Sequence, residues 1–414
     1  MAETTCQFNK EWFKRIGIYL AVFTCLLVAG FLIFNFKSQK SEPLPLKEDN
    51  PPAGISSQVN NSVESLSEED LLLKEKIGQM IMVGFRGLAL TDNPKLQKQI
   101  EEGSVGGVIL FDYDLLNKTY KRNIQNKEQL KKLTTDLQNI ASTTLFIAID
   151  EEGGMVERLK ESYGFKKDIS AQKVGELGLT FALKVGLEIG YELKEAGFNM
   201  NFAPVVDINL NPNNPIIGKL ERSFATTGLG VAQFVEQFIL GQSQQGIISV
   251  VKHFPGHGSS VGDSHTGLVD ITATYKQEEL TPYYYLQSKG LLKAVMTAHI
   301  VNKNIDPSGL PATLSPLFIQ NILRKQIGFT GVVISDDMQM GAIAKYYGFN
   351  EALIKAINAG CDILILSNNS TSGYDEAIAQ KALEVIFQAV KDGKIPQEKI
   401  NNSFNLIIEL KSQI

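Results

Sequence analysis

The chain has 414 residues, of which 43% are hydrophobic and 21% charged, a composition typical of a globular protein. Its length suits one large enzyme domain. Forty basic and forty-five acidic residues give a formal charge of −5, which argues against a nucleic-acid binder that neutralises phosphates. The cysteines, Cys6, Cys25 and Cys361, are too few and too scattered for a disulfide framework.

A long apolar run lies near the N-terminus. Residues 16–36 (IGIYLAVFTCLLVAGFLIFNF) contain no charge and are long enough to cross roughly 30 Å of hydrocarbon. Because Lys10, Lys14 and Arg15 precede the run, we expect residues 1–15 to stay in the cytoplasm. A cleaved signal peptide and a buried core helix are the alternatives. The run predicts a single-pass membrane protein, anchored in the lipid bilayer, with its main domain in the periplasm or outside the cell.

The next segment has the composition of a linker. Residues 37–66 combine four prolines with serine, asparagine, glutamate and lysine, and contain little apolar surface to bury. The sequence Ser67-Glu68-Glu69-Asp70 then fits a capping box that opens a helix. We therefore place a single folded domain at residues 67–414.

Short apolar runs alternate with longer helical stretches through this domain. The runs cover residues 79–85, 106–111, 145–150, 199–207, 247–253, 293–299, 331–336 and 361–367. Continuous apolar runs are typical of strands that are buried on both faces, as in a parallel sheet. Eight strand–helix units in about 350 residues favour a single (β/α)8 barrel of the TIM type over an open doubly wound sheet.

Polar residues end five of these runs, at the edge where a barrel carries its active site. They are Asp150, Asp207, Lys252 with His253, His299, and Asp336 with Asp337. Charged groups rarely lie against so much apolar surface without a partner, so we expect a functional site. The alternative is that these strand ends are simply exposed to solvent.

A loop rich in glycine and histidine follows the fifth run. Asp263 and His265 are two residues apart, so both side chains point the same way on an extended segment. A carboxylate beside one ring nitrogen would fix the tautomer and strengthen the other nitrogen as a base, giving a pair for proton transfer. A zinc site of His253, His257, Asp263 and His265, and a purely structural histidine cluster, are the competing interpretations.

The remaining candidates carry charge that could bind or attack a sugar. A carboxylate at Asp336, at the end of a buried run, could attack an anomeric carbon. The alternative role, capping the next helix, fits Asp337 better. Two pairs of side chains could hydrogen-bond sugar hydroxyls or form salt bridges at the rim: Asp150 with Arg158, and Arg222 with Lys252.

Several segments together resemble glycoside hydrolase family 3. They are KIGQMIMVG, GGVILF, IDEEGG, NFAPVVDIN, ERSF, KHFPGHG with GDSHT, AHIV and SDDMQM. The resemblance covers roughly residues 66–414, and KHFPGHG followed by DSH is specific to the β-N-acetylglucosaminidase branch that acts on peptidoglycan fragments. Two departures affect the aglycone side: Met155 stands where the family usually has arginine, and residues 112–114 lack its usual Arg-Asn.

The resemblance implies a role for each candidate residue. Asp336 would be the nucleophile, and His265, held by Asp263, the acid/base. Subsite −1 would be formed by Asp150, Arg158, Arg222, Lys252 and His253. It also implies that the chain needs no cofactor and no metal, and that no second domain follows the barrel.

The sequence thus predicts a retaining exo-β-N-acetylhexosaminidase that releases GlcNAc from muropeptides or other peptidoglycan fragments. A phosphorylase is the first alternative, because a neutral histidine would not repel phosphate as a carboxylate would. A non-catalytic, membrane-tethered module that binds the cell wall is the second.

Overall fold

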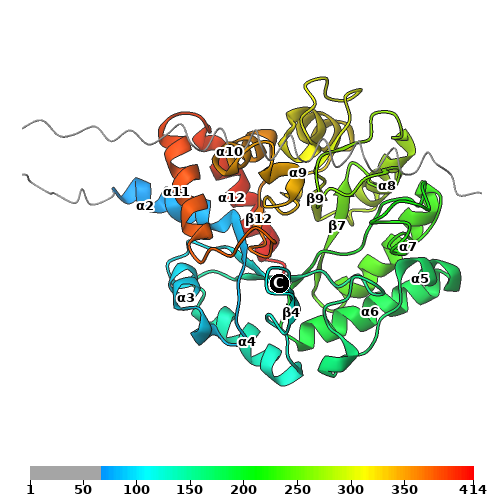
Figure 1. Ribbon diagram of the computed structural model, residues 1–414, viewed down its shortest axis with the longest axis horizontal. Helices are drawn as coiled ribbons and strands as arrows, with labels where there is room; N and C mark the ends of the chain where they lie inside the picture. The colour runs from blue at the N-terminus through cyan, green and yellow to red at the C-terminus, as the bar shows by residue number, and fades with distance from the viewer. Residues whose placement is uncertain (1–66) are drawn as a thin grey trace, which may run out of the picture. The chain divides into compact units, whose positions relative to one another are not determined.

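Parallel strands form the centre of the fold in this computed structural model, which describes residues 67–414 (Figure 1). The strands are β1 (Ile81–Gly84), β2 (Gly107–Ile109), β5 (Phe146–Ile149), β6 (Met200–Asn201), β7 (Ile248–Phe254), β9 (Ala294–Thr297), β11 (Val332–Ile334) and β12 (Leu364–Leu366). They are hydrogen-bonded in the order β11-β9-β7-β6-β5-β2-β1-β12, and every neighbouring pair is parallel. A single parallel bridge between Ile334 and Ile363 brings the two edge strands together. The sheet is therefore a nearly closed eight-stranded barrel, consistent with the TIM type.

Helices surround this barrel in the part of the chain that the structure describes (Figure 1). They are α2 (Glu68–Gln79), α3 (Pro94–Glu101), α4 (Lys127–Ile140), α5 (Ala171–Leu177), α6 (Leu179–Glu195), α7 (Gly228–Ser243), α8 (Thr281–Ser288), the π-helix η5 (Leu317–Gln326), α9 (Gly341–Ala344), α10 (Phe349–Ala359), α11 (Ile378–Lys391) and α12 (Gln397–Lys411). Short 3₁₀ turns are η1 (Leu90–Asp92), η2 (Glu161–Tyr163), η3 (Gln277–Leu280) and η4 (Ala312–Leu314).

Two small strand pairs lie in loops outside the barrel sheet. The antiparallel hairpin β3 (Tyr113–Asp114) and β4 (Thr119–Tyr120) follows β2. The parallel pair β8 (Val269–Asp270) and β10 (Ile300–Val301) links the loops after β7 and β9.

Local sequence signals account for these elements. The side chain of Ser67 accepts a hydrogen bond from the backbone N–H of Asp70 (3.2 Å), so α2 starts where the capping box predicts. Each of the eight predicted apolar runs contains or overlaps one barrel strand. All seven residues of β7 are buried, as expected for a strand covered on both faces. The prediction of a barrel built from these runs is confirmed.

The prediction of a single-pass membrane protein needs correction. Among residues 67–414, no helix is both long enough and apolar enough to cross a membrane. The predicted segments 1–15, 16–36 and 37–66 lie outside the described residues. The structure therefore does not support the membrane assignment, which rested on hydropathy and flanking charge alone.

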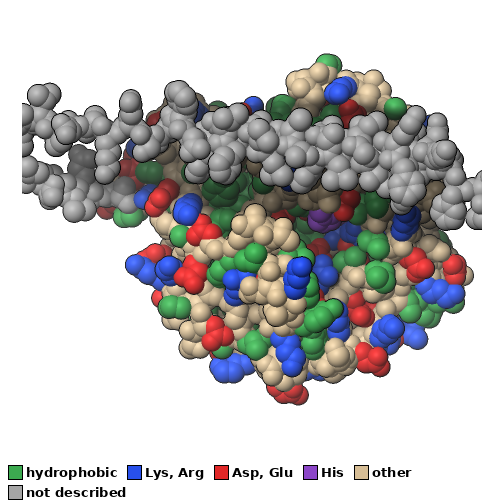
Figure 2. All heavy atoms as spheres, in the orientation of Figure 1, with side chains coloured by type: hydrophobic (Ala, Val, Ile, Leu, Met, Phe, Trp, Pro, Cys, Tyr) green, Lys and Arg blue, Asp and Glu red, His purple; other side chains and the backbone are tan. Residues whose placement is uncertain are grey.

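On the face drawn in Figure 2, Lys and Arg side chains are interspersed with Asp and Glu side chains, and a histidine is visible among them.

Candidate active site

A cavity of about 300 Å³ opens at the carboxyl ends of the strands. Its inner end is lined by side chains of the barrel strands and the residue after β6: Ile109, Phe202, Met296 and Ile365. Six of the predicted site residues also line it: Asp150, Arg158, Arg222, Lys252, His253 and His265. Asp336 lines it too, so the cavity contains every predicted site residue except Asp263, the partner of His265. Loops that follow different strands thus converge on one concave space, the usual setting of an active site in this fold.

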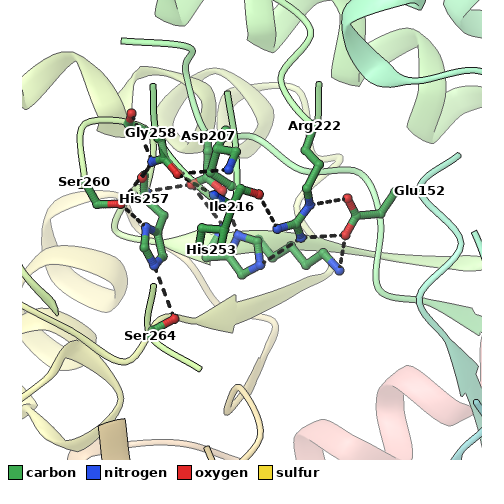
Figure 3. Close-up of polar contacts among 12 residues, drawn as sticks. Glu152, Asp207, Ile216, Arg222, His253, His257, Gly258, Ser260 and Ser264 are labelled. Atoms are coloured by element: carbon green, nitrogen blue, oxygen red, sulfur yellow. Dashed lines mark hydrogen bonds and ion pairs between the residues drawn. The ribbon is translucent and has the colours of Figure 1, made fainter. Parts of the chain in front are cut away.

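A buried network of charges forms one side of the cavity (Figure 3). Lys252 Nζ lies 2.7 Å from Asp150 Oδ1 and 2.6 Å from Glu152 Oε1. Arg222 donates from Nε and Nη2 to the two carboxylate oxygens of Glu152, each at 2.7 Å. Burial acts to raise the pKa of Glu152, but the cations Arg222 and Lys252 outweigh it and lower that pKa well below the usual range. Glu152 therefore stays ionised and holds both cations against the cavity.

Arg158 is placed less firmly than the other predicted sugar-binding residues. Its Nη2 lies 4.0 Å from Asp150 Oδ2, and its side chain is 26% exposed. Its Nε is buried without a hydrogen-bond partner among the described residues. Because the side chain is partly exposed and Nη2 makes only the long contact with Asp150, the Nη groups of Arg158 remain available to a bound molecule, whereas Lys252 and Arg222 are each engaged with carboxylates.

Asp207 organises the histidines that follow β7. Its Oδ2 lies 2.7 Å from Nδ1 of His253, and its Oδ1 accepts hydrogen bonds from the backbone N–H groups of His253 (3.3 Å) and His257 (2.8 Å). Burial would raise the pKa of Asp207, but the contact with His253 and the hydrogen bond from the His257 backbone N–H lower it below the usual value. His253 in turn lies 3.4 Å from Arg222 through Nε2, so the charge network and the histidines are continuous (Figure 3).

His257 is buried beneath the loop that carries the predicted dyad. Its Nδ1 lies 2.7 Å from Ser260 Oγ and its Nε2 lies 3.4 Å from Ser264 Oγ (Figure 3). Burial lowers the pKa of His257 to about 4, so the ring is neutral at pH 7. A neutral ring with both nitrogens facing hydroxyls supports the loop rather than binding a charged group.

The structure brings the predicted dyad together. His265 Nδ1 lies 2.7 Å from Asp263 Oδ1, and the same oxygen accepts a hydrogen bond from the His265 backbone N–H at 2.9 Å. The His265 side chain is 63% exposed and lines the cavity. The loop is tied to the start of α9, because the Ala342 N–H donates to the Ser264 carbonyl. The imidazole thus has one nitrogen on a carboxylate and the other, Nε2, available to a ligand.

Asp336 follows β11 and is partly exposed to the cavity. Its Oδ1 accepts a hydrogen bond from the Asp337 N–H at 2.8 Å. Burial raises the pKa of Asp336, but the nearby rings of His299, His253 and His265 and the hydrogen bond from the Asp337 N–H outweigh that effect and lower the pKa below the usual value. An ionised carboxylate at the inner part of a sugar-sized cavity is the feature that a nucleophile requires.

Two strand-end residues have structural roles instead. Asp337, which we considered as a helix cap, accepts from the Ser367 N–H and hydroxyl and from the Gln339 N–H, so it ties the ends of β11 and β12 together. His299 is fully buried, with Nδ1 2.8 Å from Thr313 Oγ1 and Nε2 2.9 Å from the Asp337 carbonyl oxygen.

Sequence reasoning missed Glu152 as a site residue. It follows Asp150 in the run IDEEGG, and its acidic neighbourhood was the only available signal. Its role depends on Arg222, from the loop after β6, and on Lys252, from strand β7. Asp207 was recognised as a strand end but not as the group that holds His253.

The predicted zinc alternative receives no support from the geometry. Within residues 67–414, one group of three carboxylates has oxygens within 4.8 Å of one another, and it consists of Glu151, Glu157 and Asp168 rather than the histidines. Glu151 and Asp168 are buried, and burial raises the pKa of both, that of Asp168 to about 7. Protonation therefore relieves the repulsion within this group.

Residues 72–410 match the glycosyl hydrolase family 3 N-terminal domain. The chain belongs to this family of glycosidases. It is 31% identical over 396 residues to the protein named β-hexosaminidase A of Pseudoalteromonas piscicida, covering 86% of this chain and 64% of that one. It is 36% identical over 301 residues to the β-hexosaminidase of Shewanella frigidimarina, covering 70% and 82%.

Solved structures agree with this membership. The family 3 β-N-acetylglucosaminidase from Paenibacillus sp. str. FPU-7 superimposes with a TM-score of 0.74 at 37% identity, covering 82% of this chain and 62% of that one. The β-N-acetylhexosaminidase from Beutenbergia cavernae gives a TM-score of 0.73 at 26% identity, covering 84% and 99%. The chain therefore spans somewhat less than two thirds of the length of some relatives and nearly all of others.

Proposed function

We propose that this family 3 glycosidase is a retaining exo-β-N-acetylhexosaminidase that releases terminal GlcNAc. The observation that carries the proposal is that Asp336, an ionised carboxylate, and His265, paired with Asp263, line the same cavity. The names of the relatives, β-hexosaminidase and β-N-acetylglucosaminidase, fit this chemistry.

In the first step, Asp336 attacks the anomeric carbon as the bond to the leaving oxygen breaks. Protonated His265 donates its Nε2 proton to that oxygen, so the aglycone departs as a neutral alcohol. The sugar is then covalently bound to Asp336 as an ester. Asp263 keeps the ring oriented, because its carboxylate faces Nδ1.

In the second step, the now neutral His265 removes a proton from water. The water oxygen attacks the anomeric carbon, and the bond to Asp336 breaks to return the carboxylate. Two displacements at one carbon restore the starting configuration, so the product is β-GlcNAc. His265 is protonated again and ready for the next cycle.

The charge network would hold the sugar during both steps. Asp150 accepts hydrogen bonds from sugar hydroxyls, Lys252, Arg222 and Arg158 donate to sugar oxygens, and His253, whose Nδ1 faces Asp207, accepts through Nε2. These five side chains already line the cavity, and Glu152 and Asp207 keep Arg222, Lys252 and His253 in position before substrate arrives. Groups held in place in advance add to transition-state binding without a further ordering cost.

GlcNAc-containing muropeptides are the natural substrates that we propose, since the branch that the sequence resembles acts on peptidoglycan fragments. Digestion of purified muropeptides with the enzyme, followed by mass spectrometry, tests this. Release of free GlcNAc supports the proposal, whereas intact muropeptides alongside cleavage of other GlcNAc glycosides would assign a different substrate.

The same assay separates hydrolysis from phosphorolysis. Turnover is measured with and without inorganic phosphate, and the product is identified. We expect free GlcNAc at an unchanged rate in both conditions. A phosphate-dependent rate with GlcNAc-1-phosphate as product would instead identify a phosphorylase, and no turnover of any GlcNAc glycoside would leave a non-catalytic wall-binding module.

A further inference from the structure

The segment of residues 109–115, which follows and includes the end of β2, forms a wall of the cavity from the barrel interior to the mouth. The side chains of Ile109, Phe111, Tyr113 and Leu115 line the cavity, and so does Asp112 between them. Exposure rises along the segment: Ile109 is 3% exposed, Phe111 and Tyr113 are half-buried, and Leu115 is 44% exposed. We call Phe111, Tyr113 and Leu115 the apolar wall.

The intervening aspartates anchor this wall. Asp114 is 3% exposed and lies 2.7 Å from Arg86 Nε and 2.5 Å from Arg122 Nη1. Burial acts to raise the pKa of Asp114, but these two cations outweigh it and lower that pKa to about 2. Asp114 is therefore ionised throughout the physiological range. Asp112, which also borders the cavity, lies 2.6 Å from Lys160 Nζ. The wall is therefore attached to its surroundings through two buried carboxylates.

The upper part of the wall is also fixed through Asn369, which follows β12. The Leu115 N–H donates to Asn369 Oδ1, and Asn369 Nδ2 donates to the Tyr113 carbonyl, each at 3.0 Å. The ring of Tyr113 packs edge-on against Tyr120 of β4, with centroids 4.9 Å apart. Tyr113 and Leu115 consequently stand in place before any ligand enters.

The position of Tyr113 and Leu115 relative to the catalytic groups determines which part of the substrate they contact. Strand side chains line the inner end of the cavity, so a sugar held there by Asp150 and Lys252 must direct its leaving group towards the mouth. His265, the proton donor of the proposed mechanism, is 63% exposed and faces the same opening. The leaving group, which is the part of the substrate beyond the glycosidic oxygen, therefore lies next to the exposed end of the apolar wall.

We infer that Tyr113 and Leu115 contact the first sugar ring of the leaving group and determine specificity for a saccharide aglycone. The C–H faces of a pyranose are apolar, and an aromatic ring and a leucine side chain gain free energy by covering them. The inference rests on the proposed function, because it assumes that a glycosidic bond is cleaved between the two groups.

The test compares two substrates whose leaving groups differ in size but not in chemistry. Methyl β-N-acetylglucosaminide and N,N′-diacetylchitobiose both release an alcohol, and only the second has a ring beyond the bond. For Tyr113→Ala and Leu115→Ala, we expect the ratio of kcat/KM on the disaccharide to that on the methyl glycoside to fall about five- to twentyfold. The loss should appear mainly in KM, since the catalytic groups are untouched.

Leu116→Ala is the matched control. Leu116 is 40% exposed, adjacent to the wall and absent from the cavity lining, so its removal should leave the ratio unchanged. An unchanged ratio in Leu115→Ala, with both substrates still cleaved, would overturn the inference while leaving the proposed function intact. Failure of the unmodified enzyme to cleave either substrate would overturn the function itself. Because Leu115 is exposed, its variant should fold normally, which thermal unfolding checks.

Discussion

Nδ1 of His265 lies 2.7 Å from Oδ1 of Asp263, and this contact leaves the other ring nitrogen open to the cavity. The same carboxylate oxygen accepts the His265 backbone N–H. One carboxylate thus fixes both the backbone and the ring of the residue that, in our proposal, transfers the proton.

The proton donor should matter in proportion to the basicity of the leaving group. His265→Ala should lower the rate on disaccharides by roughly 10²–10⁴-fold. It should retain much of its first-step rate on dinitrophenyl glycosides, because that leaving group departs without protonation. Added azide should accelerate the second step and give the β-azide, measured by NMR.

A second variant, Asp263→Asn, tests the contribution of the charged partner of His265. The imidazole remains but loses its charged partner, so a milder version of the same leaving-group dependence is expected. Equal losses on good and poor leaving groups in His265→Ala, without any effect of azide, would show that the histidine is structural.

The nucleophile should be identifiable by trapping. A 5-fluoro N-acetylglucosaminyl inactivator slows breakdown of the glycosyl-enzyme, so the labelled peptide should contain Asp336. Because Asp337 is adjacent, variants distinguish the two: Asp336→Asn should abolish labelling and Asp337→Asn should retain it. Labelling of another peptide, or a product of inverted configuration, would refute the assignment.

The charge network should contribute to substrate binding. Donors such as Lys252 and Arg222, when placed on sugar oxygens, are each worth about 1.5–3 kcal/mol, so Lys252→Ala and Arg222→Ala should each lower kcat/KM roughly ten- to a hundredfold. Lys173, exposed and paired with Glu176, offers a control in which Lys173→Ala leaves kcat/KM unchanged. Unaltered kcat/KM in both network variants would make these cations structural.

The stability of the enzyme should depend on the protonation of Asp168. Burial, reinforced by Glu192 and Glu157, raises its pKa from 3.8 to about 7 in the folded state. Between these two pKa values the folded state holds a proton that the unfolded state releases. The contribution of Asp168 to the free energy of unfolding therefore falls as the pH rises from about 4 to 7, and it stays constant above pH 7.

Asp168→Asn removes that titration. No hydrogen bond to the Asp168 carboxylate is present among the described residues, so asparagine can replace it without loss of an acceptor. At pH 8 the variant should melt about 3 °C or more above the unmodified protein, and the difference should shrink towards pH 4.5. Glu75→Gln, at an exposed position of α2, should show no such change. A constant difference at all pH values would contradict the assignment.

Short-range features of the sequence were sufficient to predict the barrel and the contact between Asp263 and His265. Each apolar run contains or overlaps a strand. A strand that is buried on both faces needs consecutive apolar side chains, and this pattern can be read from the run alone. Asp263 and His265 are two residues apart, so their contact forms within one loop and needs no knowledge of the rest of the fold.

Only the tertiary structure decided which charges meet. Glu152 binds Arg222 and Lys252, which lie 70 and 100 residues further along the chain, so no local pattern could reveal it as the centre of the network. His299 resembled the other strand ends in sequence, yet packing buried it away from the cavity. Strand position is set by local hydrophobicity, whereas the partner and exposure of a polar side chain depend on which strands and loops the nearly closed barrel brings together.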